Sequence, residues 1–313
     1  MPNKVVIIGS GMMGSGIAAI SALAGNYTVL VDVVQESAEK GILTAKESIA
    51  ILLKNELTTE KEAKTAETLL EWNCCMETAL KNADMVIEAV YENLELKQKL
   101  FKEIDKLLPP KVPIASNTSG LRITDIAAGV KHKERTMTTH FWFPAHLVPL
   151  VEVVMSEWTD PEIALKMKNE LNRWGKKAVL VKKDLSGQLA NRILQAIIRE
   201  AASIVEMGLA SPEDVDIAVK MGMGIRFPAW GPLEHVDGVG VDLCTLVQNT
   251  VLPDISADKE ACTLMENMVK RGDLGAKTGQ GFYNWNEKDM NKLKDERDNF
   301  IIEALKILKR GNL

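Results

Sequence analysis

The chain has 313 residues, of which 46% are hydrophobic and 26% are charged, so it is long enough for two domains and too apolar for a disordered chain. The 38 basic and 43 acidic residues leave a formal net charge of −5, so we expect no nucleic-acid partner. Apolar stretches are interrupted before the ~18 residues that a membrane-spanning helix requires, so we also expect no membrane span.

Short apolar runs alternate with helical segments through the first 185 residues. Strand-like runs occur at 5–8, 28–31, 84–90, 113–116, 136–140, 148–154 and 179–181. Apolar residues at helical spacing cover 17–23, 37–53 and 94–108, and the charged stretch 55–72 predicts a further, solvated helix. Because strands that alternate with helices are typical of βαβ units, we predict a Rossmann-type α/β domain with a doubly wound, mainly parallel sheet over residues 1–185.

The pattern changes near residue 187 and becomes helical. Helices are predicted at 189–207, 212–221, 241–248, 260–271 and 288–310. We therefore predict an all-helical C-terminal domain over residues 186–313.

A glycine-rich loop follows the first predicted strand and opens the first helix. Residues 9–14 contain Gly9, Gly11 and Gly14 in the pattern GxGxxG, with Met12 and Met13 between the last two glycines. In this context the pattern predicts a dinucleotide site whose pyrophosphate lies at the N-terminus of the helix. The alternative is an ordinary glycine turn.

Asp32 ends the second predicted strand, where a carboxylate accepts hydrogen bonds from the adenosine ribose of a dinucleotide. The same carboxylate would repel a 2′-phosphate, and no Lys or Arg follows it before Lys40. We therefore expect NAD rather than NADP as the cofactor.

His140 ends one predicted strand, and Glu152 lies within the apolar strand that follows. A buried carboxylate needs a partner, and a histidine that it orients becomes a general base. A structural His–Glu pair, or a surface glutamate on an edge strand, is the alternative.

Two further segments carry polar residues at positions that can face a ligand. Residues 116–120 follow a strand of the predicted sheet, and Asn191 lies on the first helix of the second domain. A helix cap or an ordinary turn explains the first segment equally well, and an inter-helix hydrogen bond explains Asn191.

As an ordered set, these residues resemble the 3-hydroxyacyl-CoA dehydrogenase family along essentially the whole chain. The matching features are the glycine loop with Asp32, residues 88–93, residues 116–119, His140 with Glu152, Asn191, and residues 277–283. The resemblance implies an NAD-dependent dehydrogenase in which a histidine base removes the proton of the substrate hydroxyl.

The resemblance also assigns roles to individual residues. His140 is the base, Glu152 orients it, and Ser119 and Asn191 hydrogen-bond the reacting oxygen. The residues expected to contact NAD, besides the glycine loop and Asp32, are Glu92, Lys97 and Lys277. The helical domain is expected to close the substrate cleft and to form a homodimer.

Departures from the family pattern concern the substrate. Phe143 replaces an amide that helps to fix the histidine and the substrate, and Gly120 replaces a second serine. The helix that meets the CoA phosphates in the family keeps Ser48, but residues 49–55 offer only Lys54 as a cation. A multiply phosphorylated ligand would bind poorly there.

These departures favour a small free hydroxy acid over an acyl-CoA thioester. The chain is in this respect closer to the family's non-CoA members, such as L-carnitine and L-gulonate dehydrogenases. Arg226 is the candidate partner of the substrate carboxylate, and a salt bridge to Glu234 or Asp237 is the alternative. An (S)-3-hydroxyacyl-CoA dehydrogenase and a non-catalytic dinucleotide-binding protein stay open as other functions.

The cysteines indicate a compartment and not a site. Cys74, Cys75, Cys244 and Cys262 have neither the number of a disulfide framework nor the spacing of a zinc site. We therefore expect a reducing, cytoplasmic environment, no bound metal, and buried thiols at Cys74 and Cys75.

Overall fold

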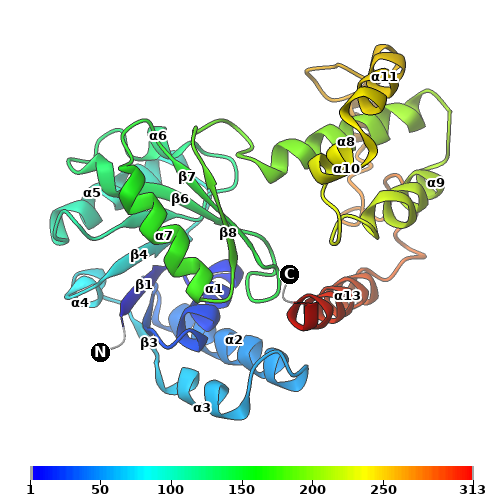
Figure 1. The fold of residues 1–313 in the computed structure, drawn as a ribbon. Coiled ribbons are helices and arrows are strands. Elements are labelled where there is room, and N and C mark those ends of the chain that lie inside the picture. Colours follow the sequence, from blue (N-terminus) through cyan, green and yellow to red (C-terminus); the bar gives the residue numbers. More distant parts are fainter. Residues whose placement is uncertain (1–2, 312–313) are drawn as a thin grey trace. The chain divides into compact units, whose positions relative to one another are not determined.

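The computed structural model describes residues 3–311, which divide into two units (Figure 1). The first unit comprises the residues up to Ala190 together with those from Arg297 onward. The second unit comprises Asn191–Glu296. None of the described helices is long and apolar enough to cross a membrane.

An eight-stranded sheet forms the centre of the first unit, in the order β3-β2-β1-β4-β5-β6-β7-β8. The strands are β1 (Lys4–Ile8), β2 (Tyr27–Val31), β3 (Leu70–Asn73), β4 (Met85–Glu88), β5 (Ile114–Ser116), β6 (Thr136–Phe141), β7 (Leu150–Met155) and β8 (Lys177–Val181). All neighbouring strands are parallel except β6 and β7, which are antiparallel. The predicted Rossmann-type fold is therefore confirmed.

Helices cover both faces of this sheet. They are α1 (Met12–Leu23), α2 (Gln35–Lys54), α3 (Glu60–Thr68), α4 (Met76–Leu80), α5 (Leu94–Leu107), α6 (Ile123–Ile126) and α7 (Pro161–Arg173), with the 3₁₀ turn η1 (Lys133–Arg135). Val5 and Ile7 belong to the apolar cluster that contains α1, α2 and α7, whereas Val6 and Ile8 belong to the cluster that contains α5 and α6. Successive side chains of a strand point to opposite faces, so a strand covered on both sides is apolar throughout.

Three expectations for this unit were wrong or incomplete. The predicted helix over 55–72 is too long, because α3 ends at Thr68 and β3 follows it as an edge strand. Helix α7 was not predicted. Cys74 and Cys75 are exposed and not buried, because they lie in the turn after β3, where the backbone N–H of Cys75 donates to Oδ1 of Asn73.

The second unit is helical apart from two isolated β-bridges, as predicted. Its elements are α8 (Ala190–Glu206), α9 (Pro212–Ile217), the π-helix η2 (Ala218–Gly224), α10 (Pro232–Val239), α11 (Val241–Val251), the 3₁₀ turn η3 (Leu252–Asp254), α12 (Thr263–Arg271) and the first residues of α13 (Met290–Gly311).

Most of α13 packs with the first unit, which differs from the predicted helical domain of residues 186–313. Ile302 is 4% exposed within the apolar cluster around α1 and α2, and Ile301 packs against that cluster. Helical periodicity identifies the apolar side of α13, but it does not say which unit that side contacts.

Candidate active site

The glycine loop connects β1 to α1, and two of its glycines are required by packing. Gly9 has φ +107°, and a Cβ on Gly14 would lie 1.8 Å from the backbone oxygen of Gly9. A Cβ on Gly11 would meet nothing within 4 Å, although Gly11 caps the N-terminus of α1. The open space at Gly11 fits a pyrophosphate that approaches the backbone closely, and a side chain would fill that space.

The residues between the last two glycines differ in exposure. Met12 is 72% exposed, whereas Met13 is half-buried and packs against the core. Their predicted contact with NAD would therefore come from the backbone of the first turn of α1, and from Met12 if a side chain contributes.

Asp32 lies directly after β2 and faces the glycine loop. Its Oδ2 accepts hydrogen bonds from the Ser10 hydroxyl at 2.6 Å and from the Ser10 backbone N–H at 3.2 Å, and its Oδ1 accepts from the Val34 N–H at 3.2 Å. Burial raises the pKa of Asp32, but the hydrogen bonds from Ser10 and Val34 prevail and hold it below its ordinary value. Asp32 is therefore ionised at neutral pH, as a partner for ribose hydroxyls requires.

His140 and Glu152 face each other across the antiparallel pair of β6 and β7. Nδ1 of His140 lies 2.7 Å from Oε2 of Glu152, and Nε2 of His140 lies 3.1 Å from Oγ of Ser119. His140 is 4% exposed, and Glu152 is fully buried. The structure thus brings together three of the predicted site residues, from β6, from β7 and from the turn after β5.

Glu152 holds its charge in the core because four donors surround it. Besides His140, its carboxylate accepts from Nε1 of Trp142 at 3.1 Å and from the backbone N–H groups of Leu189 and Ala190 at 2.9 Å each. Burial raises the pKa of Glu152, but the bond to His140 and the three other hydrogen bonds outweigh it and lower the pKa to about 2.

An ionised Glu152 determines the tautomer of the imidazole. It requires a proton on Nδ1 of His140, which leaves the lone pair of Nε2 free to accept from the Ser119 hydroxyl. The arrangement can therefore take up a proton at Nε2, next to a hydroxyl that can hydrogen-bond the same reacting oxygen.

A second buried charge pair lies beside this site and was not predicted as one. Glu88 is fully buried at the end of β4, and Lys97 of α5 is 1% exposed. Oε1 of Glu88 accepts from Nζ of Lys97 and from the backbone N–H of Val90, both at 2.6 Å, and Oε2 accepts from the Ser116 hydroxyl at 2.6 Å. A charged residue at the end of an apolar strand was the signal in the sequence.

This pair supports Glu92, which holds the turn that carries Ser119. Nζ of Lys97 lies 3.4 Å from Oε2 of Glu92. Oε1 of Glu92 accepts from the Thr118 hydroxyl at 2.5 Å and from the N–H groups of Ser119 at 3.2 Å and Gly120 at 3.0 Å. The ammonium of Lys97 is buried between the two glutamates, and its expected contact with NAD stays a prediction.

Gln188 holds the same turn from the other side, and sequence reasoning did not identify it. It is 6% exposed with φ +52°, and its Nε2 donates to the backbone oxygen of Thr118 at 2.9 Å. Its Oε1 has no partner among the described residues. Gln188 lies in the turn before α8, directly after Gly187, and its sequence context gave no signal of a buried amide.

Phe143 follows the histidine strand and is 48% exposed. The guanidinium carbon of Arg297, from α13, lies 5.3 Å from the centre of its ring. Arg297 also forms an ion pair with Asp298 at 2.7 Å. The aromatic residue that replaces the amide of the family thus stacks against a cation.

Three predicted site residues lie in the second unit. Asn191 is the second residue of α8, Lys277 is exposed in the loop after α12, and Arg226 is exposed after η2. Nε of Arg226 donates to the backbone oxygen of Gly222 at 2.9 Å. The roles of these residues stay predictions.

The alternative explanation of Arg226 was wrong. Within the described part of the chain, Arg226 forms no ion pair with Glu234 or Asp237, and Glu234 instead accepts from the backbone N–H of Gly231 at 2.7 Å. The described residues also contain no group of three or more histidine, cysteine or acidic side chains arranged to hold a metal ion.

Family models match most of both units and end before α13. The NAD-binding domain of 3-hydroxyacyl-CoA dehydrogenase matches residues 4–185, and the C-terminal domain of the same enzyme matches residues 187–285. The chain is 37% identical to a probable 3-hydroxybutyryl-CoA dehydrogenase of Bacillus subtilis, over 91% of this chain and 98% of that protein. It is 30% identical to 5-formyl-3-hydroxy-2-methylpyridine 4-carboxylate 5-dehydrogenase of Mesorhizobium japonicum, over 98% of this chain and 99% of that protein.

Solved structures give the same two kinds of relative. The crystal structure of an NAD⁺-dependent 5-formyl-3-hydroxy-2-methylpyridine 4-carboxylic acid 5-dehydrogenase has a TM-score of 0.90 at 29% identity and covers 99% of each chain. The (S)-3-hydroxybutyryl-CoA dehydrogenase of Ralstonia eutropha has a TM-score of 0.75 at 36% identity, over 91% of this chain and 99% of that one. These similarities confirm NAD as the cofactor.

Proposed function

Because the chain belongs to the 3-hydroxyacyl-CoA dehydrogenase family and uses NAD, we propose that it interconverts a 3-hydroxy and a 3-oxo compound, with a small free acid as the substrate. The observation that carries this proposal is the hydrogen-bonded series Glu152, His140 and Ser119. It provides an oriented base with a free nitrogen and a hydroxyl beside it, which is what oxidation of an alcohol requires from the protein.

The residues of the site divide the reaction between them. Nε2 of His140 takes the proton of the substrate hydroxyl, while Ser119 and Asn191 hydrogen-bond the oxygen that becomes the carbonyl. Ionised Glu152 stabilises the imidazolium that forms. When bound, NAD supplies the acceptor for the hydride that leaves the adjacent carbon. Asp32 and the backbone at Gly11 hold its ribose and pyrophosphate.

The surface of α2 supports a substrate without CoA. The hydroxyl of Ser48 is buried and donates to the backbone oxygen of Thr44 at 3.0 Å, so it is already committed within the helix. Leu52 of α2 lines one cavity together with Leu305 and Leu308 of α13. Within residues 49–55 of α2, where a CoA phosphate would need cations, the chain offers only Lys54.

The extent of the similarities points the same way. The C-terminal family match ends at residue 285, before α13 begins. The alignment with the Mesorhizobium pyridine-carboxylate dehydrogenase covers 98% of this chain, whereas the alignment with the probable 3-hydroxybutyryl-CoA dehydrogenase of Bacillus covers 91% of it. We assign the substrate carboxylate to Arg226, whose guanidinium is exposed and has no carboxylate partner within the described residues.

A 3-hydroxyacyl-CoA dehydrogenase is the second candidate, favoured by the 37% identity to the Bacillus protein. Steady-state assays separate the two, with 3-hydroxybutyrate and NAD in one arm and acetoacetyl-CoA and NADH in the other. A kcat/KM above ~10⁴ M⁻¹s⁻¹ for acetoacetyl-CoA would refute the free-acid substrate. Arg226→Met should raise KM for the free acid and leave the thioester reaction unchanged.

Three remaining predictions belong to the same proposal and need separate measurements. A catalytic role requires that His140→Ala abolish turnover, and unchanged turnover would support a non-catalytic dinucleotide-binding protein. A homodimer predicts twice the chain mass, 34.5 kDa each, by light scattering in solution. The cytoplasmic location is tested by fractionation of the source cells.

A further inference from the structure

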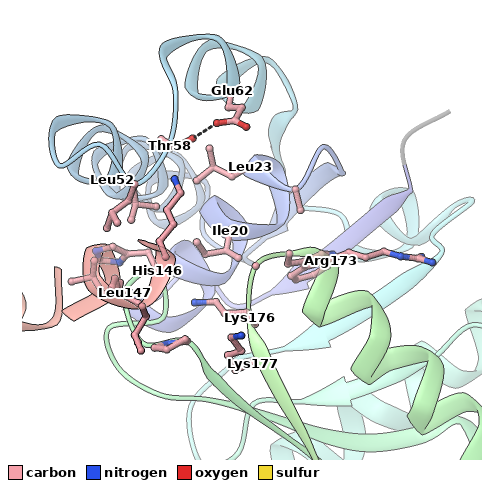
Figure 2. Close-up of a pocket in the computed structure, with 18 residues that line it drawn as sticks. Ile20, Leu23, Leu52, Thr58, Glu62, His146, Leu147, Arg173, Lys176 and Lys177 are labelled. Atoms are coloured by element: carbon pink, nitrogen blue, oxygen red, sulfur yellow. Dashed lines mark hydrogen bonds between the residues drawn. The ribbon is translucent and has the colours of Figure 1, made fainter. Parts of the chain in front are cut away.

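A cavity of about 470 Å³ lies in the first unit, on the side of the sheet covered by α1 and α2. Ile20, Leu23 and Leu52 form one wall, and Leu305 and Leu308 of α13 line it as well. Figure 2 shows Glu62 and Thr58 at one end and Lys176 and Lys177 at the other, with the apolar side chains of α1 between them. Its volume falls in the range of small-molecule sites.

The cavity is lined by more cations than anions. Arg173, Lys176, Lys177 and Lys309 contribute to its lining, against a single carboxylate from Glu62. The carboxylate of Glu62 already accepts hydrogen bonds from Thr58 and Thr59 at the N-terminus of α3. Arg173 pairs with Glu170 at 2.9 Å. In the described part of the chain none of the three lysines lies within 4.0 Å of a carboxylate oxygen, although the charge of Lys309, after the hydrogen bonds from Thr59 and Thr58, helps to lower the pKa of Glu62.

Lys176 is the most informative of these side chains, because it is 5% exposed. Its Nζ donates to the backbone oxygens of Ala145 at 2.5 Å and Val148 at 2.9 Å. An ammonium has three donors, so one is left without a partner among the described residues. A buried ammonium without an anion is costly, and the neighbouring cations add to that cost.

Two shifted pKa values agree with this geometry. Burial lowers the pKa of Lys176 to about 7. Burial, and after it the charge of Lys176, lowers the pKa of His146 to about 4, although Asp298 opposes the shift. Burial is thus the main cause of both shifts, and the charge of Lys176 adds to it at His146.

We propose that this cavity binds an amphipathic monocarboxylate, whose carboxylate accepts from Lys176 and whose aliphatic or aromatic body packs between α1, α2 and α13. A monoanion matches the single unpaired donor, and the leucine walls exclude a ligand that is polar throughout. The proposal does not depend on the substrate, because none of the catalytic residues lines this cavity. It makes α13 one wall of a second ligand site.

Octanoate is a suitable probe, titrated by calorimetry into the full-length protein saturated with NAD. We expect a Kd of about 1 mM or lower. Octanol, which lacks the charge, and acetate, which lacks the apolar body, should each bind at least about tenfold more weakly. Equal binding of octanol or of acetate would overturn the proposal, and so would the absence of octanoate binding.

Two variants locate the site. Lys176→Met and Leu308→Trp should each weaken octanoate binding at least about tenfold, the first by removing the donor and the second by filling the cavity. Lys61→Met, at an exposed lysine of α3 outside the cavity, should bind like the wild type. If either of the first two variants binds normally, or if the hydroxy acid substrate displaces octanoate, the cavity is not the site.

Discussion

Replacing Glu152 by glutamine tests the central assignment, because it removes the charge and keeps the shape. Glutamine still offers one carbonyl oxygen, which can accept from the N–H groups of Leu189 and Ala190. The other end of the side chain becomes an NH₂ group, which would face the donors of His140 and Trp142. The imidazole is then stable only with its proton moved from Nδ1 to Nε2.

The moved proton eliminates the base. With a proton on Nε2, His140 has no lone pair towards Ser119 or the substrate hydroxyl, which removes the advantage of general base catalysis. We expect kcat to fall by about 10²–10⁴-fold, while NAD affinity stays unchanged because Glu152 does not touch the glycine loop.

The assay follows NADH absorbance with 3-hydroxybutyrate or acetoacetyl-CoA, whichever the wild type turns over. Trp142→Phe is the matched control, because it removes one of the four donors to Glu152 and leaves the charge and the His140 bond in place. It should cost less than about tenfold in kcat. If Glu152→Gln keeps kcat within about tenfold of the wild type, Glu152 does not set the tautomer of the base.

Other predictions concern the cofactor loop and the second charge pair. Asp32→Ala should weaken NAD binding by about 10–100-fold in a calorimetric titration and affect NADP much less; equal losses would contradict its role. Gly11→Ala should keep the melting temperature and lose NAD binding, whereas Gly14→Ala should lower both, because its Cβ would lie 1.8 Å from a backbone oxygen. Lys97→Met should reduce the free energy of unfolding by about 3–5 kcal/mol in urea, because it leaves Glu88 buried without its cation; an unchanged midpoint would argue against the pair.

The sheet could be predicted where each strand is buried on both faces. Residues 5–8 are continuously apolar because α1 and α2 cover one side and α5 covers the other, and such runs are visible in a sequence. Strand β3 was not predicted because it lies at the edge of the sheet, where Glu71 and Trp72 are exposed and no apolar run is required. Long-range packing, as of Ile302 on the first unit, leaves no local pattern.

The pair of His140 and Glu152 was visible for a different reason. Glu152 breaks an otherwise apolar strand, and only a partnered carboxylate is tolerated there, so the sequence pointed to His140. Lys97 was assigned to the cofactor through the family resemblance alone. Its burial on Glu88 depends on the packing of α5 against β4 and β5, which the spacing of residues does not encode.

Ser119 is where the two buried networks meet. Glu152 positions the imidazole from the side of β7, and Glu92, supported by Lys97, positions the turn that carries the Ser119 hydroxyl. Glu152 holds one partner of the 3.1 Å contact between His140 and Ser119, and Glu92 holds the other. Moving either partner would break hydrogen bonds to a carboxylate, which is costly where that carboxylate is buried. The groups around His140 therefore need to move little when the proton is transferred, although the imidazole is almost fully buried. Such preorganisation is what an effective general base requires.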